Sequence, residues 1–318
     1  MLEDIVRFLK KSDYYLSGEE ISQSLSISRA AIWKYMQELR RLGYEIAAVP
    51  HLGYQLTASP DRLFPWEVQF DLGTKVLGQK IVYEDSVPST MDVAFKLGGQ
   101  KAPEGTVVCA ESQTKGRGRM GRGWVSPKGK GIYFSLILRP KLPPNEAAKL
   151  TLLCAVAVAE AVARVSGIEA RIKWPNDLLV GKKKLAGILT ELHAETDRVK
   201  FVVVGVGLNV NTPESQLPTD ATSLRLEAGR VFSRVQVLQE VLRELEHWYL
   251  RFGREGFPPV LERWKELSLT LGRRVRVADP AGFVEGEAKD IDEDGGLLIR
   301  QDTGVIVKRM AGDVVWAH

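Results

Sequence analysis

The first sixty residues show two different spacings of apolar side chains. Three segments repeat apolar residues every three or four positions, which predicts helices in residues 2–11, after Ser17, and from a cap at Ser28 to about residue 42. Residues 44–49 and 54–57 alternate instead, which predicts two short strands. Three helices followed by a small hairpin are the layout of a winged helix-turn-helix.

The middle of the chain mixes both spacings. Strands are expected at residues 80–84, 106–110, 132–138, 171–173, 184–192 and 200–210. Helices are expected at residues 90–97, 146–165 and 233–252, the second capped by Asn145 and ended by Gly167. Because the order does not follow strict strand–helix–strand alternation, we predict an α+β domain around one mixed sheet.

Short alternating segments dominate the C-terminal part. They lie at residues 273–278, 283–291, 297–301 and 305–309, with turn residues between them. This pattern favours a small SH3-like β-barrel. We therefore expect three domains: a winged helix-turn-helix at 1–62, a central α+β domain at 63–269, and an SH3-like domain at 270–318.

Composition excludes several classes of protein. No apolar run reaches the length of a membrane span, and the acidic, amphipathic N-terminus is not that of a signal peptide. Cys109 and Cys154 lie in apolar surroundings and are expected to be buried thiols. The four histidines do not fall at a metal-binding spacing. These features indicate a protein of the reducing cytoplasm, with no membrane partner.

The third predicted helix carries most of the basic character of its domain. Four bases face one acid on it, although residues 1–60 hold seven bases and seven acids. A helix that enters a DNA groove needs such local positive charge. The candidate DNA-binding residues are Ser28, Arg29, Lys34 and Arg40. The balanced charge of the whole segment leaves a helical protein-interaction domain as the alternative.

The segment 116–124 alternates glycine with arginine and ends at Trp124. It lies in a window, residues 112–145, that holds eight Lys and Arg residues and no acid, in a chain whose net charge is +4. Glycine allows close approach of the backbone, consecutive amides can bind an anion, and arginine adds forked donors. The segment is therefore a candidate site for a polyanionic ligand; a solvated loop or an RNA-binding tract is the alternative.

Four other segments of the middle part could carry chemistry. They are Ser89-Thr90-Met91-Asp92, Lys173-Trp174-Pro175-Asn176-Asp177, Lys184-Leu185-Ala186-Gly187-Ile188-Leu189, and Gly205-Val206-Gly207-Leu208-Asn209. A helix cap and an Asx-turn are ordinary explanations for the first two. No set of side chains forms an evident nucleophile. The profile fits a reaction in which the protein binds phosphates and the substrates supply the nucleophiles.

These motifs, in this order, resemble those of the bacterial bifunctional biotin–protein ligases, which also repress the biotin operon. The matching residues are Ser89-Thr90, Gln113, residues 116–122 with Trp124, residues 173–177, residues 184–189 with Glu191-Leu192, and Gly207-Leu208-Asn209. The resemblance covers the full length of the chain, and the joint occurrence of the motifs is highly specific.

The resemblance implies a two-step reaction with ATP, biotin and Mg²⁺. Biotin would form biotinyl-5′-AMP, and a lysine of a biotin carboxyl carrier protein, that of acetyl-CoA carboxylase, would then take the biotin. It implies Lys184, Arg119 and Asp177 as catalytic residues, Asp177 acting on the incoming lysine. The implied ligand-binding residues are Ser89, Thr90, Met91, Gln113, Gly116, Arg117, Gly118, Arg119, Arg122, Trp124, Asn176, Lys184, Gly187 and Asn209, the last also for Mg²⁺.

The same resemblance implies repression by an adenylate-loaded homodimer bound to operator DNA. Two positions depart from the family pattern: Met91 stands where asparagine is frequent, and Met120 where arginine is frequent. Three rival functions stay open at this point. They are a lipoate or octanoate ligase of related fold, a regulator that binds biotin without transferring it, and a ligase whose N-terminal domain does not bind DNA.

Overall fold

A computed structural model describes residues 1–195, 198–279 and 282–317. The chain forms two compact units, Met1–Asp71 and Leu72–His318. The central and C-terminal parts of the sequence therefore belong to one unit, which holds the candidate site.

The first unit has the predicted helices and hairpin. Its elements are α1 (Leu2–Lys10), α2 (Gly18–Leu25), α3 (Arg29–Arg41), β1 (Glu45–Val49), β2 (Gly53–Ala58) and α4 (Pro65–Gln69). The hydroxyl of Ser28 accepts a hydrogen bond from the Ala31 amide, which confirms the predicted cap of α3. Helix α4 escaped prediction because five residues are too few to show a helical period.

The second unit is organised around a seven-stranded mixed sheet. The strands are β3 (Ile81–Glu84), β4 (Val107–Ala110), β5 (Ile132–Leu138), β6 (Arg171–Lys173), β7 (Asp177–Val180), β8 (Lys183–Ala194) and β9 (Val199–Leu208). Their order is β3-β4-β5-β9-β8-β7-β6. Strands β3 and β4 are parallel and the other neighbours are antiparallel.

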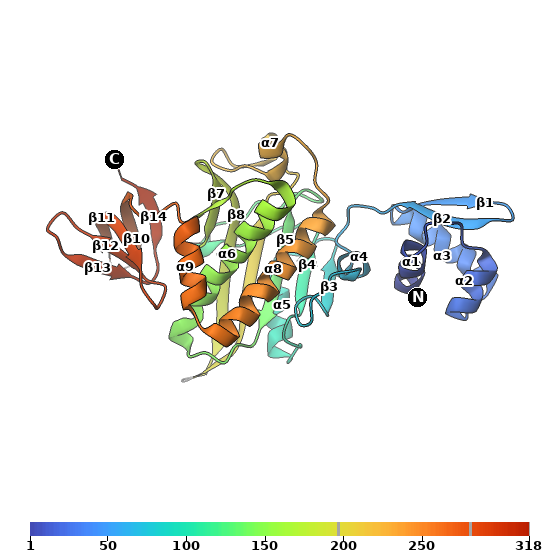
Figure 1. Ribbon diagram of the computed structural model, residues 1–318, viewed down its shortest axis with the longest axis horizontal. Coiled ribbons are helices and arrows are strands. Elements are labelled where there is room, and N and C mark those ends of the chain that lie inside the picture. The colour runs from blue at the N-terminus through green and yellow to red at the C-terminus, as the bar shows by residue number, and fades with distance from the viewer. Residues whose placement is uncertain (196–197, 280–281, 318) are drawn as a thin grey trace. The chain divides into compact units, whose positions relative to one another are not determined.

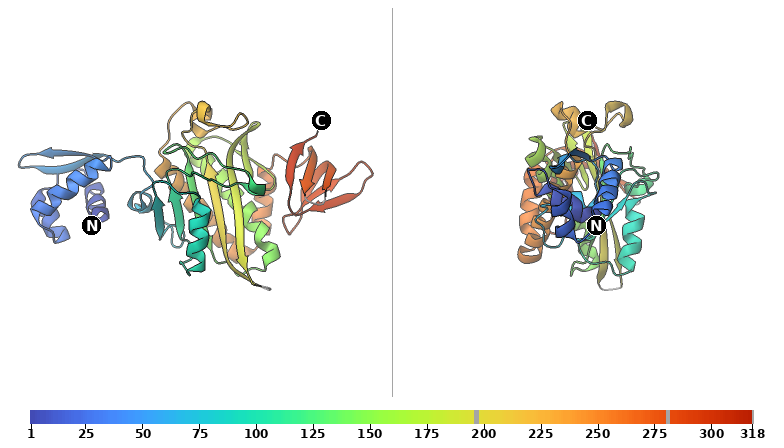
Figure 2. Two further views of the ribbon diagram at one scale, coloured as in Figure 1. Left: turned by 180° about the vertical axis from the view of Figure 1, so that it is seen from behind. Right: turned by 90° about the vertical axis from the view of Figure 1, so that its right-hand side faces the viewer.

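Helices cover both faces of this sheet. The helices α6 (Ala147–Ser166), α8 (Arg234–Glu255) and α9 (Pro258–Leu267) lie together on one face (Figure 1). Helix α5 (Thr90–Gly99) lies on the other (Figure 2). Helix α6 ends at Gly167, as predicted, but Asn145 does not cap it. Asn145 lies instead in a 3-10 turn, η2 (Pro144–Glu146), which precedes the helix.

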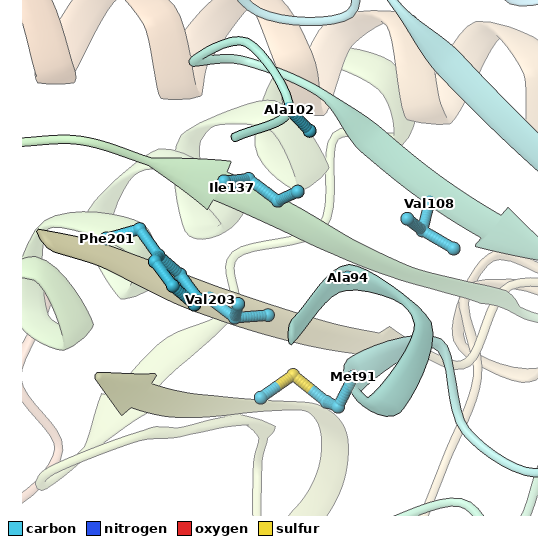
Figure 3. Packing of buried hydrophobic residues seen from close by; sticks show 7 residues of the cluster. All are labelled: Met91, Ala94, Ala102, Val108, Ile137, Phe201 and Val203. Atoms are coloured by element: carbon cyan, nitrogen blue, oxygen red, sulfur yellow. The ribbon is translucent and has the colours of Figure 1, made fainter. Parts of the chain in front are cut away.

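Helix α5 is fixed by a buried cluster beneath it. Met91 and Ala94 of this helix pack against Val108, Phe201 and Val203 of the sheet (Figure 3). The α5·β4, α5·β5 and α5·β9 contacts anchor the helix along its length. The packing holds the start of the helix, with its hydroxyl side chains, against the sheet.

The C-terminal strands form a five-stranded antiparallel sheet, here called the C-terminal sheet. It consists of β10 (Arg274–Asp279), β11 (Gly282–Ile291), β12 (Leu297–Arg300), β13 (Ile306–Arg309) and β14 (Asp313–Trp316), in the order β13-β12-β11-β10-β14. Strand β14 was not predicted from the sequence. Trp174 directly follows β6 of the seven-stranded sheet, and Gly295 precedes β12 of the C-terminal sheet. The Trp174 indole donates a hydrogen bond of 3.2 Å to the Gly295 carbonyl and so connects the two sheets.

Both cysteines are buried free thiols, as predicted. In the described part of the chain, no helix has the length and apolar character that crossing a bilayer requires.

Candidate active site

The floor of one cavity in the second unit is a set of glycines on β8 and β9. A Cβ atom at residue 207 would lie 2.3 Å from Cε2 of Trp124, and one at residue 187 would lie 3.0 Å from the same ring. A Cβ at residue 205 would lie 2.5 Å from Sδ of Met91. Glycine is therefore required at residues 187, 205 and 207 so that the side chains of Trp124 and Met91 can pack directly against the sheet.

The structure brings most of the predicted ligand-binding residues into this one cavity. The lining includes Ser89, Thr90, Met91, Gln113, Arg117, Gly118, Arg119, Arg122, Trp124, Asn176, Asp177, Lys184 and Gly187. Gly116 is not a lining residue, and a Cβ atom there would lie 2.4 Å from the Trp124 carbonyl oxygen. The cavity thus joins segments that lie far apart in the sequence.

A hydrogen-bonded group of hydroxyls and one amide includes Thr90 and Gln113 of the cavity lining. Gln113 Oε1 accepts from the Thr90 amide at 2.9 Å, and Gln113 Nε2 donates to Ser126 Oγ at 3.0 Å. Thr90 Oγ1 and Ser135 Oγ lie 2.8 Å apart. Sequence reasoning missed Ser135. Its signal was a hydroxyl in the middle of a strand, β5, whose residues are all buried.

The loop 116–124, here called the cover, is held by ion pairs to other elements. Nη2 of Arg117 lies 2.9 Å from Oδ1 of Asp92 on α5 and 3.1 Å from Oε2 of Glu191 on β8. The Arg117 guanidinium is therefore already paired with carboxylates, while the backbone beside it lines the cavity.

Arg119 and Arg122 connect the cover to the rest of the unit. Arg119 Nη1 donates to Asn176 Oδ1 at 2.9 Å and to the Gly312 carbonyl at 3.2 Å. Burial lowers the pKa of the Arg119 guanidinium, and the nearby carboxylates of Asp313 and Asp177 oppose that shift. Arg122 forms an ion pair with Asp313, a lining residue that gave no local signal in the sequence.

Lys184 lines the cavity beside Asp177 and Trp124. Its Nζ lies 2.7 Å from Oδ1 of Asp177; the two groups form an ion pair, but their geometry is not that of a hydrogen bond. The same Nζ lies 5.5 Å from the centre of the Trp124 ring. The buried Nε1 of Trp124 has no hydrogen-bond partner among the described residues. The site therefore offers a cation, a carboxylate and an unused indole donor beside a glycine floor.

Comparison with known proteins assigns this arrangement to a family. Family models match residues 83–209 (Biotin/lipoate A/B protein ligase family), 2–55 (HTH domain) and 270–316 (Biotin protein ligase C terminal domain). The chain is 42% identical to the bifunctional ligase/repressor BirA of Bacillus subtilis over 302 residues, 94% of this chain and 93% of that protein. The chain belongs to the biotin–protein ligase family.

Two further members support the assignment. The biotin–[acetyl-CoA-carboxylase] ligase of Mycobacterium tuberculosis is 39% identical over 217 residues, 67% of this chain and 79% of that protein. The solved biotin protein ligase of Aquifex aeolicus, in complex with biotin and ATP, is 31% identical with a TM-score of 0.64, covering 74% of this chain and 98% of that one. Both of these proteins are biotin ligases, so the comparison identifies this chain as a biotin ligase and not a lipoate ligase.

Asn209, the residue predicted to bind Mg²⁺, forms a hydrogen bond within the fold. Its side chain is buried outside the cavity lining, and its Nδ2 donates to the Thr222 carbonyl at 3.0 Å. Among the described residues, no group of three or more His, Cys, Asp or Glu side chains could hold a metal ion. Asp177 and Asp313 do line the cavity. Mg²⁺ commonly takes one or two carboxylates together with substrate phosphates, and these two side chains offer that type of ligand, although each is paired with a cation of the cavity.

The HTH domain of this biotin–protein ligase presents a partly exposed basic helix. Arg29 is paired with Glu19 at 2.9 Å, and Arg40 Nη2 donates to the Ile46 carbonyl at 2.8 Å. The hydroxyl of Ser28 caps α3. Lys34 is exposed, and so is Trp33, with 58% of its surface accessible. Of the predicted DNA-binding residues, Lys34 is therefore the one whose charge faces outward without an ion pair in the described structure.

Proposed function

We propose that the cavity binds biotin and ATP side by side and makes biotinyl-5′-AMP. A carboxylate oxygen of biotin attacks the α-phosphorus, and the bond from that phosphorus to the bridging oxygen of pyrophosphate breaks. In the second step the amine of a lysine on the carrier protein attacks the acyl carbon, AMP leaves, and the amine loses a proton. The observation that carries this proposal is the Lys184 ammonium on a glycine floor beneath an arginine-rich cover.

The hydroxyls and the amide of the lining suit the ring system of biotin. Ser89, Thr90 and Gln113 provide donors and acceptors in the cavity, and Met91 and Phe134 provide apolar contact. Small-molecule sites commonly combine such an apolar wall with a few placed polar groups. The reacting carboxylate would then point toward Lys184 and the cover.

Lys184 and Arg119 would stabilise the charge that develops on the phosphate. Fixed cations in a site that excludes water lower the energy of such a transition state without reorganising. Mg²⁺ bound with ATP would be held by Asp177 or Asp313 and would neutralise phosphate charge. The cover would keep water from the labile adenylate.

Asp177 is suited to orient the incoming amine of the carrier protein. Its carboxylate lies beside Lys184, at the lining of the cavity, and is 23% exposed. A carboxylate in that position can accept a hydrogen bond from the attacking amine. The acceptor would be the biotin carboxyl carrier protein of acetyl-CoA carboxylase, because the relative in Mycobacterium tuberculosis bears the name of a ligase for that enzyme.

A second function, repression of transcription by a homodimer, is favoured by the HTH domain and by one edge of the sheet. Strand β7 pairs with β8 only as far as Gly187. In the described chain, no strand pairs with the outer edge of β8 from residue 189 to 194. Such an edge can pair with the same edge of a second copy around a two-fold axis. Two HTH domains would then bind an inverted-repeat operator. We also infer a cytoplasmic location, because the proposed reaction uses ATP and the proposed repression acts on DNA.

The proposal is tested by biotin-dependent labelling of a purified carrier domain with ATP and Mg²⁺. The parent protein should label the carrier, and Lys184→Ala should reduce labelling by about a hundredfold or more, since a charge placed at the reacting phosphate is worth several kcal/mol. Lys183→Ala is the matched control, because Lys183 is half exposed and lies 3.9 Å from Glu214 outside the cavity. Labelling by Lys184→Ala at the parent rate would contradict the proposal.

A further inference from the structure

Ser126 is buried and does not line the cavity, but its hydroxyl contacts two residues that do. Ser126 Oγ accepts a hydrogen bond from Gln113 Nε2 at 3.0 Å and donates one to the Trp124 carbonyl at 3.2 Å. A Cβ atom at Gly116 would lie 3.0 Å from Ser126 Oγ and 3.1 Å from Gln113 Nε2. Glycine at residue 116 therefore leaves room for the contact between these two side chains.

The Trp124 carbonyl fixes the direction of the hydrogen bonds on one side of Gln113. A carbonyl oxygen only accepts, and a serine hydroxyl has a single proton. The proton of Ser126 is used on the Trp124 carbonyl, so Ser126 can only accept from Gln113. One of the two protons on Gln113 Nε2 is therefore used on Ser126.

The backbone amide of Thr90 fixes the direction on the other side of Gln113. This amide only donates, and it lies 2.9 Å from Gln113 Oε1. The Thr90 hydroxyl donates to the same oxygen at 3.2 Å. If the Gln113 side-chain amide were turned over, its nitrogen would lie against the Thr90 N–H, with two donors facing each other. The oxygen of Gln113 therefore faces Thr90, and its nitrogen faces Ser126.

Ser135 extends this network on the strand β5. Its Oγ lies 2.8 Å from Thr90 Oγ1, and either oxygen could donate. Because the Thr90 proton is used on Gln113, the Ser135 hydroxyl is the donor. Among the described residues, the buried Ser135 hydroxyl has no other acceptor. All the hydrogen bonds between these side chains therefore point the same way, from Ser135 through Thr90, Gln113 and Ser126 to the Trp124 carbonyl.

The direction of this network determines what the cavity presents to a ligand. Thr90 and Gln113 both line the cavity. The Thr90 hydroxyl, whose proton is used, keeps a lone pair that can accept a hydrogen bond. Gln113 Nε2 keeps its second proton, which has no acceptor in the described part of the chain. A matching ligand needs an N–H group beside a carbonyl oxygen, which is the arrangement in a cyclic urea such as the ureido ring of biotin.

We propose that Ser126 is a positioning residue that makes the cavity selective for a ligand with a carbonyl oxygen. This inference rests on the proposed function, in which biotin is that ligand. Ser126 does not contact biotin; it holds the Gln113 amide so that the second Nε2 proton is offered to the ureido oxygen. Gln113 Oε1 accepts two hydrogen bonds, which polarises the amide and strengthens donation from its nitrogen.

Biotin and iminobiotin differ at the atom that this proton would contact. In iminobiotin an imino group replaces the ureido oxygen, and in its protonated form that group donates hydrogen bonds and cannot accept one. It would face the Gln113 proton as a second donor. The ratio of the two dissociation constants therefore reports the orientation of the Gln113 amide, whereas a general loss of packing would weaken the binding of both ligands alike.

The experiment compares Ser126→Ala, Ser126→Thr and Ser166→Ala with the parent protein, by isothermal titration calorimetry with each ligand at neutral pH. Ser126→Ala should reduce the preference for biotin over iminobiotin about five- to tenfold, the effect of losing one neutral hydrogen bond. Ser126→Thr keeps the hydroxyl and should keep the preference. Ser166→Ala is the matched control, because Ser166 Oγ donates to the Val162 carbonyl at 2.6 Å and Ser166 does not line the cavity. This control should match the parent.

Four results would overturn the inference while leaving the proposed function intact. They are an unchanged preference in Ser126→Ala, an equal weakening of both ligands in that variant, an equal loss of preference in Ser126→Thr, and the same loss in Ser166→Ala. Failure of the parent protein to bind biotin would overturn the proposed function, and this inference with it.

Discussion

The floor of the cavity and the cover above it reach a defined shape by different physical means. The floor uses Gly187, Gly205 and Gly207, whose missing side chains leave room for Trp124 and Met91. The cover uses charge: Arg117 is paired with Asp92 and Glu191, and Arg122 with Asp313. Steric fit is insensitive to salt, whereas partly exposed ion pairs are weak and screened. A fixed floor with a releasable cover suits a site that must hold an intermediate and later admit a second substrate.

Substitution at the base of the cover, where Arg234 and Glu111 form an ion pair, should have the largest effect on stability, because these charges are buried. Arg234 Nη1 lies 2.8 Å from Glu111 Oε2, and both side chains are at most 2% exposed. The same nitrogen donates to the Gly131 carbonyl at 3.3 Å, so the guanidinium holds both ends of the segment that carries the cover. Glu111→Gln should lower the free energy of unfolding by about 3–5 kcal/mol, measured in urea.

The control for that variant is Glu195→Gln. Glu195 pairs with Lys200 at 3.0 Å while 59% exposed, so its loss should change stability by about 1 kcal/mol or less. Similar destabilisation by the two variants would show that burial does not distinguish the base of the cover from its surface.

A substitution in the glycine floor should have the next largest effect on stability. Gly207→Ala places a methyl group inside the Trp124 ring contact, which should destabilise the protein by about 1–3 kcal/mol and displace the ring. Adenylate formation from biotin and ATP should fall together with the change in stability. Gly253→Ala is the matched change, because nothing lies within 4 Å of a Cβ there. Parent-like adenylate formation by Gly207→Ala would mean that the floor is not rigid.

The ion pairs of the cover should give the smallest effect. Glu191→Gln removes one of two carboxylates from Arg117, a change worth about 0.2–1 kcal/mol for a partly exposed pair. Release of biotinyl-5′-AMP should therefore quicken by about fivefold at most. Added salt should quicken release from the parent more than from this variant. If salt had the same effect on release from both proteins, the claim that ion pairs hold the cover in place would be wrong.

Sequence reasoning succeeded where a signal was local. The winged helix-turn-helix, the α+β centre and the run of C-terminal strands followed from the spacing of apolar residues, and Lys184, Gln113 and residues 117–119 stood in short motifs. Asp313 and Glu191 gained their partners only through folding, since Asp313 lies on another sheet from the cover residue that it contacts. No pattern along the chain records such a pairing.

Two residues show how a motif can mislead about position. Asn209 stands beside glycines of the floor, yet its side chain turns away and binds the Thr222 carbonyl. Arg117 belongs to the anion-binding motif, yet its guanidinium is paired with carboxylates. In both cases the direction of the side chain depends on residues more than ten positions away, which the motif does not contain.

Retention of biotinyl-5′-AMP by Arg119→Gly would test most directly the claim that the cover holds the intermediate. Arg119 ties the cover to Asn176 and to the Gly312 carbonyl, while the biotin end of the cavity is built from other residues. The variant should bind biotin with the affinity of the parent but lose biotinyl-5′-AMP during gel filtration, where the parent keeps it. Retention of the adenylate by Arg119→Gly as complete as that of the parent would contradict the account.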